Sequence, residues 1–364
     1  MATSCLKCSA SAREGALCET CAARLRALLA ARAGVRRATS GRSRAAIAAA
    51  SLVCAAATVV AAIVAPHPEA AHTATGQWRV LDTPDFLSPV GAAEDRDGNL
   101  YVVDAASDRI AKLDPDGKQL RTFGMPGSGP GQFGRPTAIA VDGLGNLYVA
   151  DTGNSRIQEL SASGVPLQVW GSPGQGPGEF NGPRGLAVDR EDNVYVADTG
   201  NDRVQKLSAT AQVISVWGHT GDRPGEFRQP YGIAVDAEGA IYVADHWNNR
   251  VQKFSPTPAP TPTPTATPTP TGEPLAVWGG FGASVGQFNN PRSVVLDAHG
   301  NIYVADSFNH RIQKLSPTGF PLAEWGGRGG EPGQFRRPEG IIIEPDGGMI
   351  VVDADNDRVQ RYTP

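Results

Sequence analysis

The sequence is short of cysteine, charge and long hydrophobic runs over most of its length. All five cysteines fall within the first 54 of its 364 residues, so a fold stapled by disulfides is excluded for the remainder. Charged residues make up 19%, too few for a charge-rich disordered chain, and 40% hydrophobic residues are enough to build a core. Glycine and proline, by contrast, are abundant at 43 and 29 residues. This excess is typical of many short strands joined by turns.

The net charge of −4 averages two opposed segments. Residues 1–44 hold nine Lys and Arg against two Glu, a net of +7, so the rest of the chain carries −11. Such an asymmetry suggests a membrane-sided arrangement or a nucleic-acid tail. Residues 45–65 favour the membrane, because 21 uncharged residues at about 1.5 Å each span roughly the 30 Å core of a bilayer.

The predicted transmembrane helix, residues 45–65, has four arginines directly before it. The positive-inside rule therefore places the N-terminus in the cytoplasm and everything after the span outside it, as in a single-pass cell-membrane protein. A cleaved signal peptide is the alternative, but the preceding region is long and no good A-x-A site occurs before Gln77. The basic juxtamembrane segment, residues 25–44, is either an interfacial helix on anionic lipid or a solvated spacer. Residues 66–76 form a linker.

Two C-x-x-C pairs precede the basic segment, in residues 1–24. Cys5, Cys8, Cys18 and Cys21 can place four thiolates tetrahedrally around Zn²⁺. Two disulfides or a redox pair are the alternative, which a reducing cytoplasm disfavours. The segment resembles the short zinc ribbons at the N-termini of bacterial membrane proteins. Four protein ligands close the site, so the expected zinc is structural.

The exported part contains one phrase six times. A proline opens each copy, and the intervals between these prolines are 47, 47, 47, 61 and 47 residues, at Pro89, Pro136, Pro183, Pro230, Pro291 and Pro338. Each copy continues as in Gly232–Phe254, GIAVDAEGAIYVADHWNNRVQKF. The long interval contains a Pro/Thr-rich insert, residues 256–271, which we expect to be an extended polyproline-like arm.

Each copy reads as four short strands, which is the pattern of a β-propeller blade. The copies resemble NHL repeats, and six of them resemble an NHL-type six-bladed propeller over residues 77–364. The expected fold class is therefore all-β, a six-bladed NHL β-propeller with four-stranded blades, preceded by the zinc ribbon and one transmembrane helix. The last copy lacks a fourth strand, whereas Gln77–Leu81 is a spare one before the first copy. Pairing the two would close the ring and remove its exposed edges.

Residues present in all six copies are expected to build blades. The repeated Asp and Arg, such as Asp245 and Arg250, look like active-site pairs, yet their recurrence favours blade-to-blade hydrogen bonding. Function should lie where the repeat is broken. One face carries an excess of arginine over acidic residues, while the turns of the opposite face sum to −10.

The variable positions of the Arg-rich face supply the candidate ligand-binding residues. They follow the opening proline or the Asp of YVAD, and blades 4 and 5 stand out among them. We call the following set the Arg/aromatic rim: Arg184, Tyr231, His246, Trp247, Arg292, Phe308 and His310. Exposed aromatics beside arginine are typical of interface anchors. Ordinary loop variation, with these side chains packed on neighbouring blades, is the other interpretation.

The expected function is a membrane-anchored, extracytoplasmic binding or sensing scaffold for a protein, peptide, glycan or anionic ligand. The propeller resembles the exported sensor domains of bacterial receptor kinases, although no kinase lies on this chain. The alternative is an enzyme, because six-bladed relatives include lactonases and a lyase with a metal at the channel mouth. No histidine of this sequence falls on a first strand, which favours a non-enzyme. Export and the charge of −11 argue against a nucleic-acid partner.

Overall fold

A computed structural model describes residues 3–4, 11–12, 72–73, 76–255 and 274–364. The chain divides into two compact units, Met1–Glu69 and Ala70–Pro364. In the first, strands β1 (Thr3–Ser4) and β2 (Ser11–Ala12) pair antiparallel. Four predicted features lie outside the described residues. They are the zinc ligands Cys5, Cys8, Cys18 and Cys21, the basic segment 25–44, the membrane span 45–65 and the insert 256–271. Among the residues that the structure does describe, no helix is long and apolar enough to cross a bilayer.

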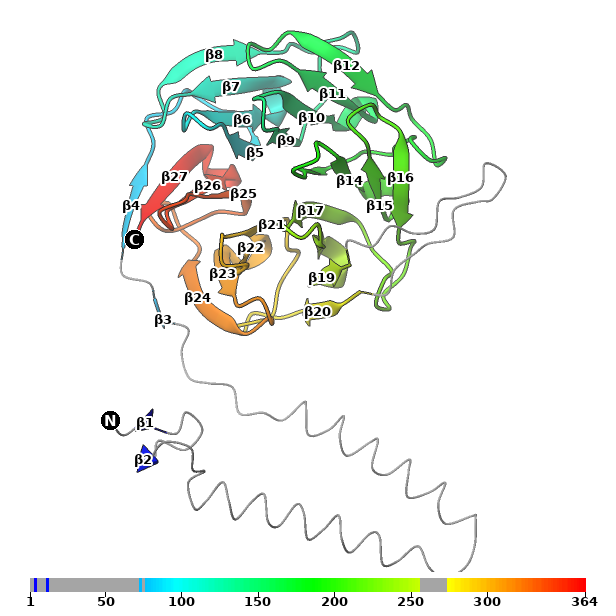
Figure 1. Ribbon diagram of the computed structural model, residues 1–364. Coiled ribbons are helices and arrows are strands. Elements are labelled where there is room, and N and C mark those ends of the chain that lie inside the picture. The colour runs from blue at the N-terminus through cyan, green and yellow to red at the C-terminus, as the bar shows by residue number, and fades with distance from the viewer. Residues whose placement is uncertain (1–2, 5–10, 13–71, 74–75, 256–273) are drawn as a thin grey trace, which may run out of the picture. The chain divides into compact units, whose positions relative to one another are not determined.

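The second unit is a ring of six antiparallel sheets around one axis (Figure 1). Blade 1 consists of β5 (Pro89–Glu94), β6 (Leu100–Asp104), β7 (Arg109–Leu113) and β8 (Gln119–Phe123). Blade 2 consists of β9 (Ala138–Val141), β10 (Leu147–Asp151), β11 (Arg156–Leu160) and β12 (Pro166–Trp170). Blade 3 consists of β13 (Gly185–Val188), β14 (Val194–Asp198), β15 (Arg203–Leu207) and β16 (Val213–Trp217).

The remaining three blades complete the circle. Blade 4 consists of β17 (Pro230–Val235), β18 (Ile241–Asp245), β19 (Arg250–Phe254) and β20 (Ala276–Gly279). Blade 5 consists of β21 (Ser293–Leu296), β22 (Ile302–Asp306), β23 (Arg311–Leu315) and β24 (Pro321–Gly326), with β3 (His72–Thr73) added in parallel to β24. Blade 6 consists of β25 (Pro338–Ile343), β26 (Met349–Asp353), β27 (Arg358–Thr363) and β4 (Gln77–Val80). The prediction of an all-β propeller with six four-stranded blades is confirmed.

Blade 6 closes the ring with a strand from the other end of the domain. β4 pairs antiparallel with β27, and Trp78 lies opposite Tyr362 in the register. The Trp78 ring also packs edge-on against Phe335, with the ring centroids 5.2 Å apart. The spare strand before the first repeat therefore supplies the missing fourth strand, as the sequence predicts. Closure of this kind joins the two ends of the domain and covers the edge of β27 that would otherwise be exposed.

The second strand of each blade is buried on both faces. In β10, Leu147 and Val149 belong to the core between blades 1 and 2, whereas Tyr148 and Ala150 belong to the core between blades 2 and 3. Successive side chains of a strand point to opposite faces, so a strand packed between two neighbours needs an unbroken apolar run. The repeated YVA sequence is the result, and the core is a set of inter-blade layers.

Each second strand leads into one turn of 3₁₀ helix on a shared face of the ring. The six turns are η1 (Ala105–Ser107), η2 (Thr152–Asn154), η3 (Thr199–Asn201), η4 (His246–Asn248), η5 (Ser307–Asn309) and η6 (Ala354–Asn356). The residue after each turn adopts a left-handed conformation, with φ between 50° and 57°. The loops that enter each blade lie beside these turns, because backbone bonds such as Gly153 N–H to Gly134 O (2.7 Å) join them.

Candidate functional site

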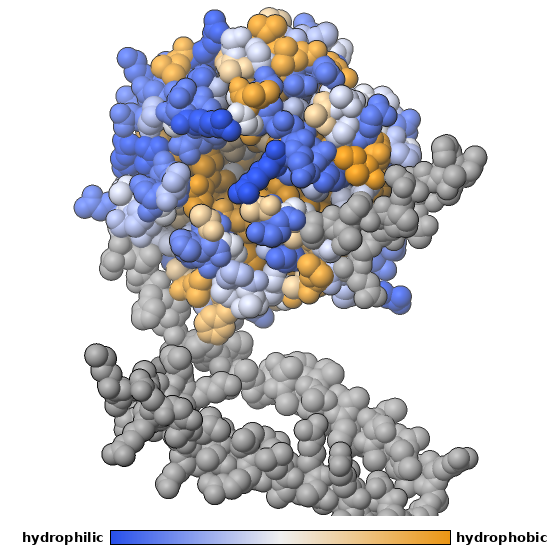
Figure 2. All heavy atoms as spheres, viewed as in Figure 1, coloured by the Kyte–Doolittle hydropathy of each residue, from blue (hydrophilic) through white to orange (hydrophobic). Residues whose placement is uncertain are grey.

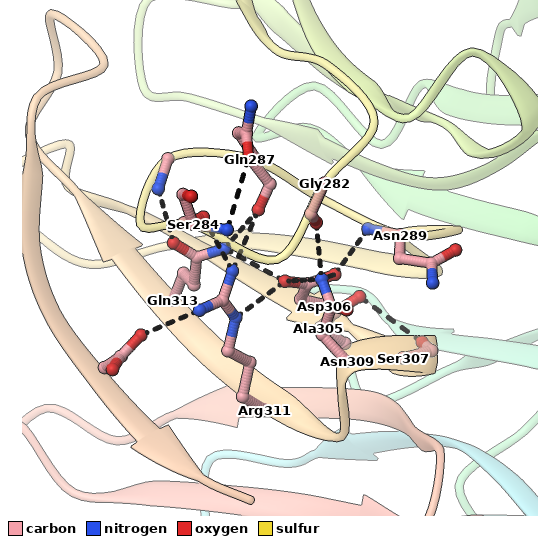
Figure 3. Close-up of polar contacts among 12 residues, drawn as sticks. Gly282, Ser284, Gln287, Asn289, Ala305, Asp306, Ser307, Asn309, Arg311 and Gln313 are labelled. Carbon is pink, nitrogen blue, oxygen red and sulfur yellow. Dashed lines mark hydrogen bonds and ion pairs between the residues drawn. The ribbon is translucent and has the colours of Figure 1, made fainter.

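The repeated Asp and Arg residues hold the loop that arrives from the preceding blade. In blade 5, Asp306 accepts hydrogen bonds from the backbone N–H of Asn289 (2.7 Å), from Arg311 Nε (2.8 Å) and from Gln313 Nε2 (3.0 Å) (Figure 3). Arg311 and Gln313 also donate to the carbonyl of Gln287, at 3.1 and 2.7 Å. The buried aspartate is therefore surrounded by donors and satisfied within the fold.

The ion pair recurs in all six blades, and the glutamine contact recurs in blades 2 to 6, because Ala111 takes the place of the glutamine in blade 1. The ion pairs are Asp104–Arg109, Asp151–Arg156, Asp198–Arg203, Asp245–Arg250, Asp306–Arg311 and Asp353–Arg358. Each pair lies within one blade, which corrects the expectation of direct bonds from blade to blade. Its contribution to blade contacts is indirect, because it anchors the connecting loop whose phenylalanine packs between the blades. These pairs are structural, as their recurrence indicates.

A second repeated contact is made by the first residue of each of the turns η2, η3, η4 and η5, which bonds to the blade that follows it. The hydroxyls at this position in blades 2, 3 and 5 donate to the carbonyl of the next opening proline, as Thr152 does to Pro183 O at 2.7 Å. In blade 4, His246 takes this place, with Nδ1 3.2 Å from Pro291 O. A carbonyl can only accept, so Nδ1 carries the proton and Nε2 accepts from Asn290 Nδ2, 3.1 Å away. His246 is 3% exposed, and burial lowers its pKa to about 4.

His310 occupies a third repeated position, the left-handed residue after η5. Its Nδ1 lies 3.0 Å from the backbone N–H of Arg337 and accepts its hydrogen bond. The corresponding side chains of blades 1 to 4 accept from the next blade in the same way: Asp108, Ser155, Asp202 and Asn249. Burial and the nearby Arg328 lower the pKa of His310, which keeps Nδ1 free to accept. Both rim histidines therefore link blades.

The residue after each opening proline lines one central cavity. These six residues, one per blade, form what we call the six-residue ring: Val90, Thr137, Arg184, Tyr231, Arg292 and Glu339. The cavity measures about 710 Å³ and is visible as a hollow at the centre of Figure 2, with apolar atoms on its walls. Inner strands approach closely around it; a Cβ on Gly185 would lie 1.8 Å from Tyr231 O. The ring brings together three predicted rim residues.

Arginine outnumbers acidic side chains around the cavity. Its lining includes Arg135, Arg184, Arg292 and Arg337 but a single carboxylate, Glu339. Glu339 pairs with Arg292 and lies 3.1 Å from Arg337 Nε. Burial raises the pKa of Glu339, while both guanidinium groups act in the opposite direction. The lining keeps a formal excess of three positive charges when Glu339 is ionised.

Tyr231 is the aromatic member of the six-residue ring, and it contacts His246 and two arginines. One face stacks on the His246 ring, with centroids 4.2 Å apart. The guanidinium carbons of Arg184 and Arg292 lie 5.0 and 5.3 Å from the Tyr231 centroid, within the range of cation–π attraction. His246 thus packs against one face of Tyr231, and both of its ring nitrogens form hydrogen bonds within the propeller.

Trp247 and Phe308 lie on the exposed part of the rim. Trp247 in η4 is 56% exposed, and Phe308 in η5 is 48% exposed. The guanidinium of Arg292 lies 5.9 Å from the Phe308 centroid, so Phe308 is connected to the ring through Arg292. The proposal that the seven rim residues bind a ligand stays a prediction.

The ring contains residues that the rim prediction left out. Thr137 and Glu339 occupy the same variable position after the proline as Arg184 and Arg292, and Arg337 lies two residues before Glu339. Applying the rule to all six blades would also have identified Val90, Thr137 and Glu339. The ion pair between Glu339 and Arg337 has no signal in the sequence.

The cavity residues do not fit the metal site of the enzyme alternative. Within residues 76–255 and 274–364, no three His, Cys, Asp or Glu side chains come together as a metal site requires. The carboxylate that lines the cavity, Glu339, is already paired with two guanidinium groups. A ligand sphere for a metal at the channel mouth is therefore not present in this part of the chain.

Comparison with known proteins identifies the repeat. The family model "NHL repeat" matches residues 133–160, 180–207, 227–254 and 288–315, which cover the incoming loop and first three strands of blades 2 to 5. The chain thus carries NHL repeats. No curated protein matches the sequence.

Solved structures share the fold. A streptogramin B lyase structure is 17% identical with a TM-score of 0.52, covering 79% of this chain and 97% of that one. A catalytically inactive virginiamycin B lyase from Staphylococcus aureus with quinupristin is 13% identical, with a TM-score of 0.52 and coverage of 80% and 99%. Selenomethionine-substituted virginiamycin B lyase from the same organism is 14% identical, with a TM-score of 0.52, and the match covers 80% of this chain and 99% of that one. At such identities the likeness shows the fold alone.

Proposed function

We propose that this chain, which carries NHL repeats on a six-bladed propeller, is a binding or sensing module for an anionic ligand. The observation that carries the proposal is the convergence of the variable position of all six blades on one cavity with four arginines and one carboxylate. Positions common to every blade serve the frame, whereas this position differs from blade to blade. A cavity of about 710 Å³ lies within the range of small-molecule sites.

The rim aromatics extend this site beyond the cavity. Trp247 and Phe308 stand exposed on neighbouring turns, next to the arginine side of the ring. Large aromatic side chains anchor ligands at little entropic cost, since they have two rotatable side-chain bonds. A protein, peptide or glycan that presents a negative group to the cavity would contact both. No nucleic-acid partner is proposed, because residues 45–364 carry a net charge of −11.

We also propose that the propeller is held outside the cytoplasm by a single membrane span. The uncharged residues 45–65 and the arginines before them support this orientation. On the cytoplasmic side, Cys5, Cys8, Cys18 and Cys21 would hold one structural zinc ion. Labelling of cysteines introduced on either side of the span in intact cells would test the topology. Labelling of both sides, or of the N-terminal side alone, would contradict it.

The binding function is tested by ligand-dependent thermal unfolding of the full chain. A ligand at free concentration L that binds the folded state alone stabilises it by RT ln(1 + L/Kd), so the unfolding temperature rises as the ligand concentration exceeds Kd. We expect anionic compounds to raise it for the native chain and for Arg190→Gln, but not for Arg184→Gln. Arg190 is a matched control, because it is an exposed arginine of the same blade in the turn between β13 and β14, and it does not line the cavity. Equal shifts in both variants would exclude the cavity as the binding site.

The rim is tested separately with a pair of aromatic variants. Phe308→Ala should weaken binding of any ligand larger than the cavity, whereas Phe320→Ala should not. Phe320 is 50% exposed in the same blade but lies between β23 and β24, away from η5. If both variants bind equally, the ligand does not extend over the rim.

A propeller lyase is the second candidate function. It is suggested by the three similar structures, which are of streptogramin B or virginiamycin B lyases. Incubation of the full chain with quinupristin, with and without divalent cations, followed by mass spectrometry distinguishes the candidates. Turnover of quinupristin would favour the lyase, and unchanged quinupristin would favour the binding module.

A further inference from the structure

The charges around the cavity are unequal in availability. Arg292 and Arg337 both contact the Glu339 carboxylate, and Arg337 also lies 2.7 Å from Asp355. Two of the four lining arginines are therefore neutralised inside the protein. Arg135 is exposed to solvent, where an ion pair contributes little. This leaves one guanidinium of the six-residue ring for a ligand.

Arg184 is that guanidinium. In the described part of the chain, no carboxylate lies within ion-pair distance of it, and its side-chain contact is the Tyr231 ring at 5.0 Å. Arg184 is half-buried, and the tyrosine ring covers part of its surface. A partly desolvated guanidinium is satisfied by an acceptor with two oxygens, because its N–H groups form a rigid fork that matches a carboxylate or a phosphate.

The part of the lining that blades 1 and 2 contribute has a different character. Blades 1 and 2 contribute small neutral side chains to the lining, among them Val90, Ala92, Ala105 and Ala138. These four side chains suit an apolar body, and the charged residue of this part of the lining is the exposed Arg135. Glu339, which faces the cavity from blade 6, would repel an additional negative charge.

From this distribution we propose that the cavity takes a monocarboxylate with a compact apolar body. The carboxylate lies on Arg184, and the body lies against the neutral walls of blades 1 and 2. The proposal rests on the binding function proposed above and narrows its ligand class. It sets a singly charged carboxylate apart from sulfate, phosphate and polyanions, which can also accept two bonds from a guanidinium but carry more than one negative charge.

Isothermal titration calorimetry of the full chain tests the proposal with three probes. The probes are benzoate, its neutral isostere benzamide, and inorganic sulfate. We expect benzoate to bind at least about 10-fold more tightly than either other probe. Arg184→Gln should weaken benzoate about 10-fold or more, and Arg190→Gln should leave it unchanged. Arg184→Lys keeps the charge but removes the fork, so its affinity should fall between those of the native chain and Arg184→Gln.

The outcomes separate this proposal from the broader one. Sulfate that binds as tightly as benzoate, with the same loss in Arg184→Gln, would overturn the carboxylate assignment and leave the anion-binding function standing. Phenylacetate and 4-methylpentanoate are two further monocarboxylates with other apolar bodies. If neither they nor benzoate bind, while an acidic peptide or glycan binds through Arg184, the carboxylate assignment is likewise wrong and the anion-binding function stands. If no anion binding depends on Arg184, both the ligand class and the cavity as the binding site are wrong.

Discussion

Replacing Glu159 by lysine should stabilise the propeller. In blades 1, 3, 4 and 5, a lysine at this place in the third strand bonds the turn aspartate of its own blade. The Nζ–Oδ2 distances are 3.2 to 3.5 Å in Lys112–Asp95, Lys206–Asp189, Lys253–Asp236 and Lys314–Asp297. Each ammonium also lies 4.8 to 4.9 Å from the centroid of the tyrosine beside it in the register. The fold thus provides a site for a cation in this position.

Blade 2 has a carboxylate where blades 1, 3, 4 and 5 have the ammonium and blade 6 has the guanidinium of Arg361. Glu159 pairs with Tyr148 in the register and is 8% exposed, and the turn aspartate Asp142 is 7% exposed. Burial and Asp142 both raise the pKa of Glu159. Burial, Glu159 and Asp142 together raise the pKa of Tyr148 well above its usual value. Two buried carboxyl groups therefore face one tyrosine, and within the described residues neither forms an ion pair, which destabilises the folded state.

The size of the gain follows from the charges that change. An ammonium at about 3.3 Å from a carboxylate gains on the order of 5 kcal/mol at an effective dielectric constant near 20, before desolvation of the lysine is counted. Net contributions of hydrogen bonds to charged groups are about 1.5–3 kcal/mol. We expect Glu159→Lys to stabilise by about 1–3 kcal/mol, and Glu159→Gln by less, since it removes the repulsion alone. For a domain of this size the lysine variant should unfold roughly 2–10 °C higher.

Denaturant titrations of the native chain and both variants at several pH values measure the effect. The folded state binds a proton on Glu159 more tightly than the unfolded state does. The free energy of unfolding of the native chain therefore decreases, through this group, as the pH rises above about 4.5. The advantage of Glu159→Gln over the native chain should therefore grow between pH 4.5 and 7. Glu238→Lys is the control, with the same charge change at an exposed turn position of blade 4. A lysine variant no more stable than the native chain, or a control with the same gain, would refute the reasoning.

Three further predictions concern the frame and the N-terminal segment. Stability should fall by about 3 kcal/mol as the pH is lowered from 6.5 towards 4, because the folded state holds His246 neutral with a pKa of about 4 while the unfolded chain takes up a proton. His246→Thr, the residue of blades 2 and 3, should flatten this decline in denaturant titrations, and an unchanged slope would assign it to other groups. Removing residues 77–80 should lower the unfolding temperature by more than about 10 °C, because β27 loses its antiparallel partner; calorimetry that shows no change would mean that β4 does not close the ring. The purified full chain should contain one zinc ion by elemental analysis, and a Cys5→Ser, Cys8→Ser variant that keeps its metal would contradict the zinc ribbon.

The propeller was largely readable from the sequence, because a blade is built from contacts within one repeat and with its neighbours. The proline and aspartate intervals identify six blades, and the unmatched strand Gln77–Leu81 identifies the closing one. The added strand β3 on blade 5 carries no such signal, since two residues in parallel pairing have no characteristic pattern. The sequence shows that Glu159 takes the place of the repeated lysine. Only the tertiary structure shows that Glu159 is buried beside Asp142.

The candidate site shows the same division. By itself, the sequence determined which positions vary from blade to blade, and it located the arginines and aromatics among them. The tertiary structure decided that the six residues after the prolines share one cavity. It also decided that Glu339 and Asp355 pair with Arg292 and Arg337, and that His246 is buried while its neighbour Trp247 is exposed. The physical reason is that these contacts join residues one or more whole blades apart, as from Arg292 to Glu339. Local pattern encodes a strand and its turn, whereas closure of the ring sets which side chains from different blades meet at its axis.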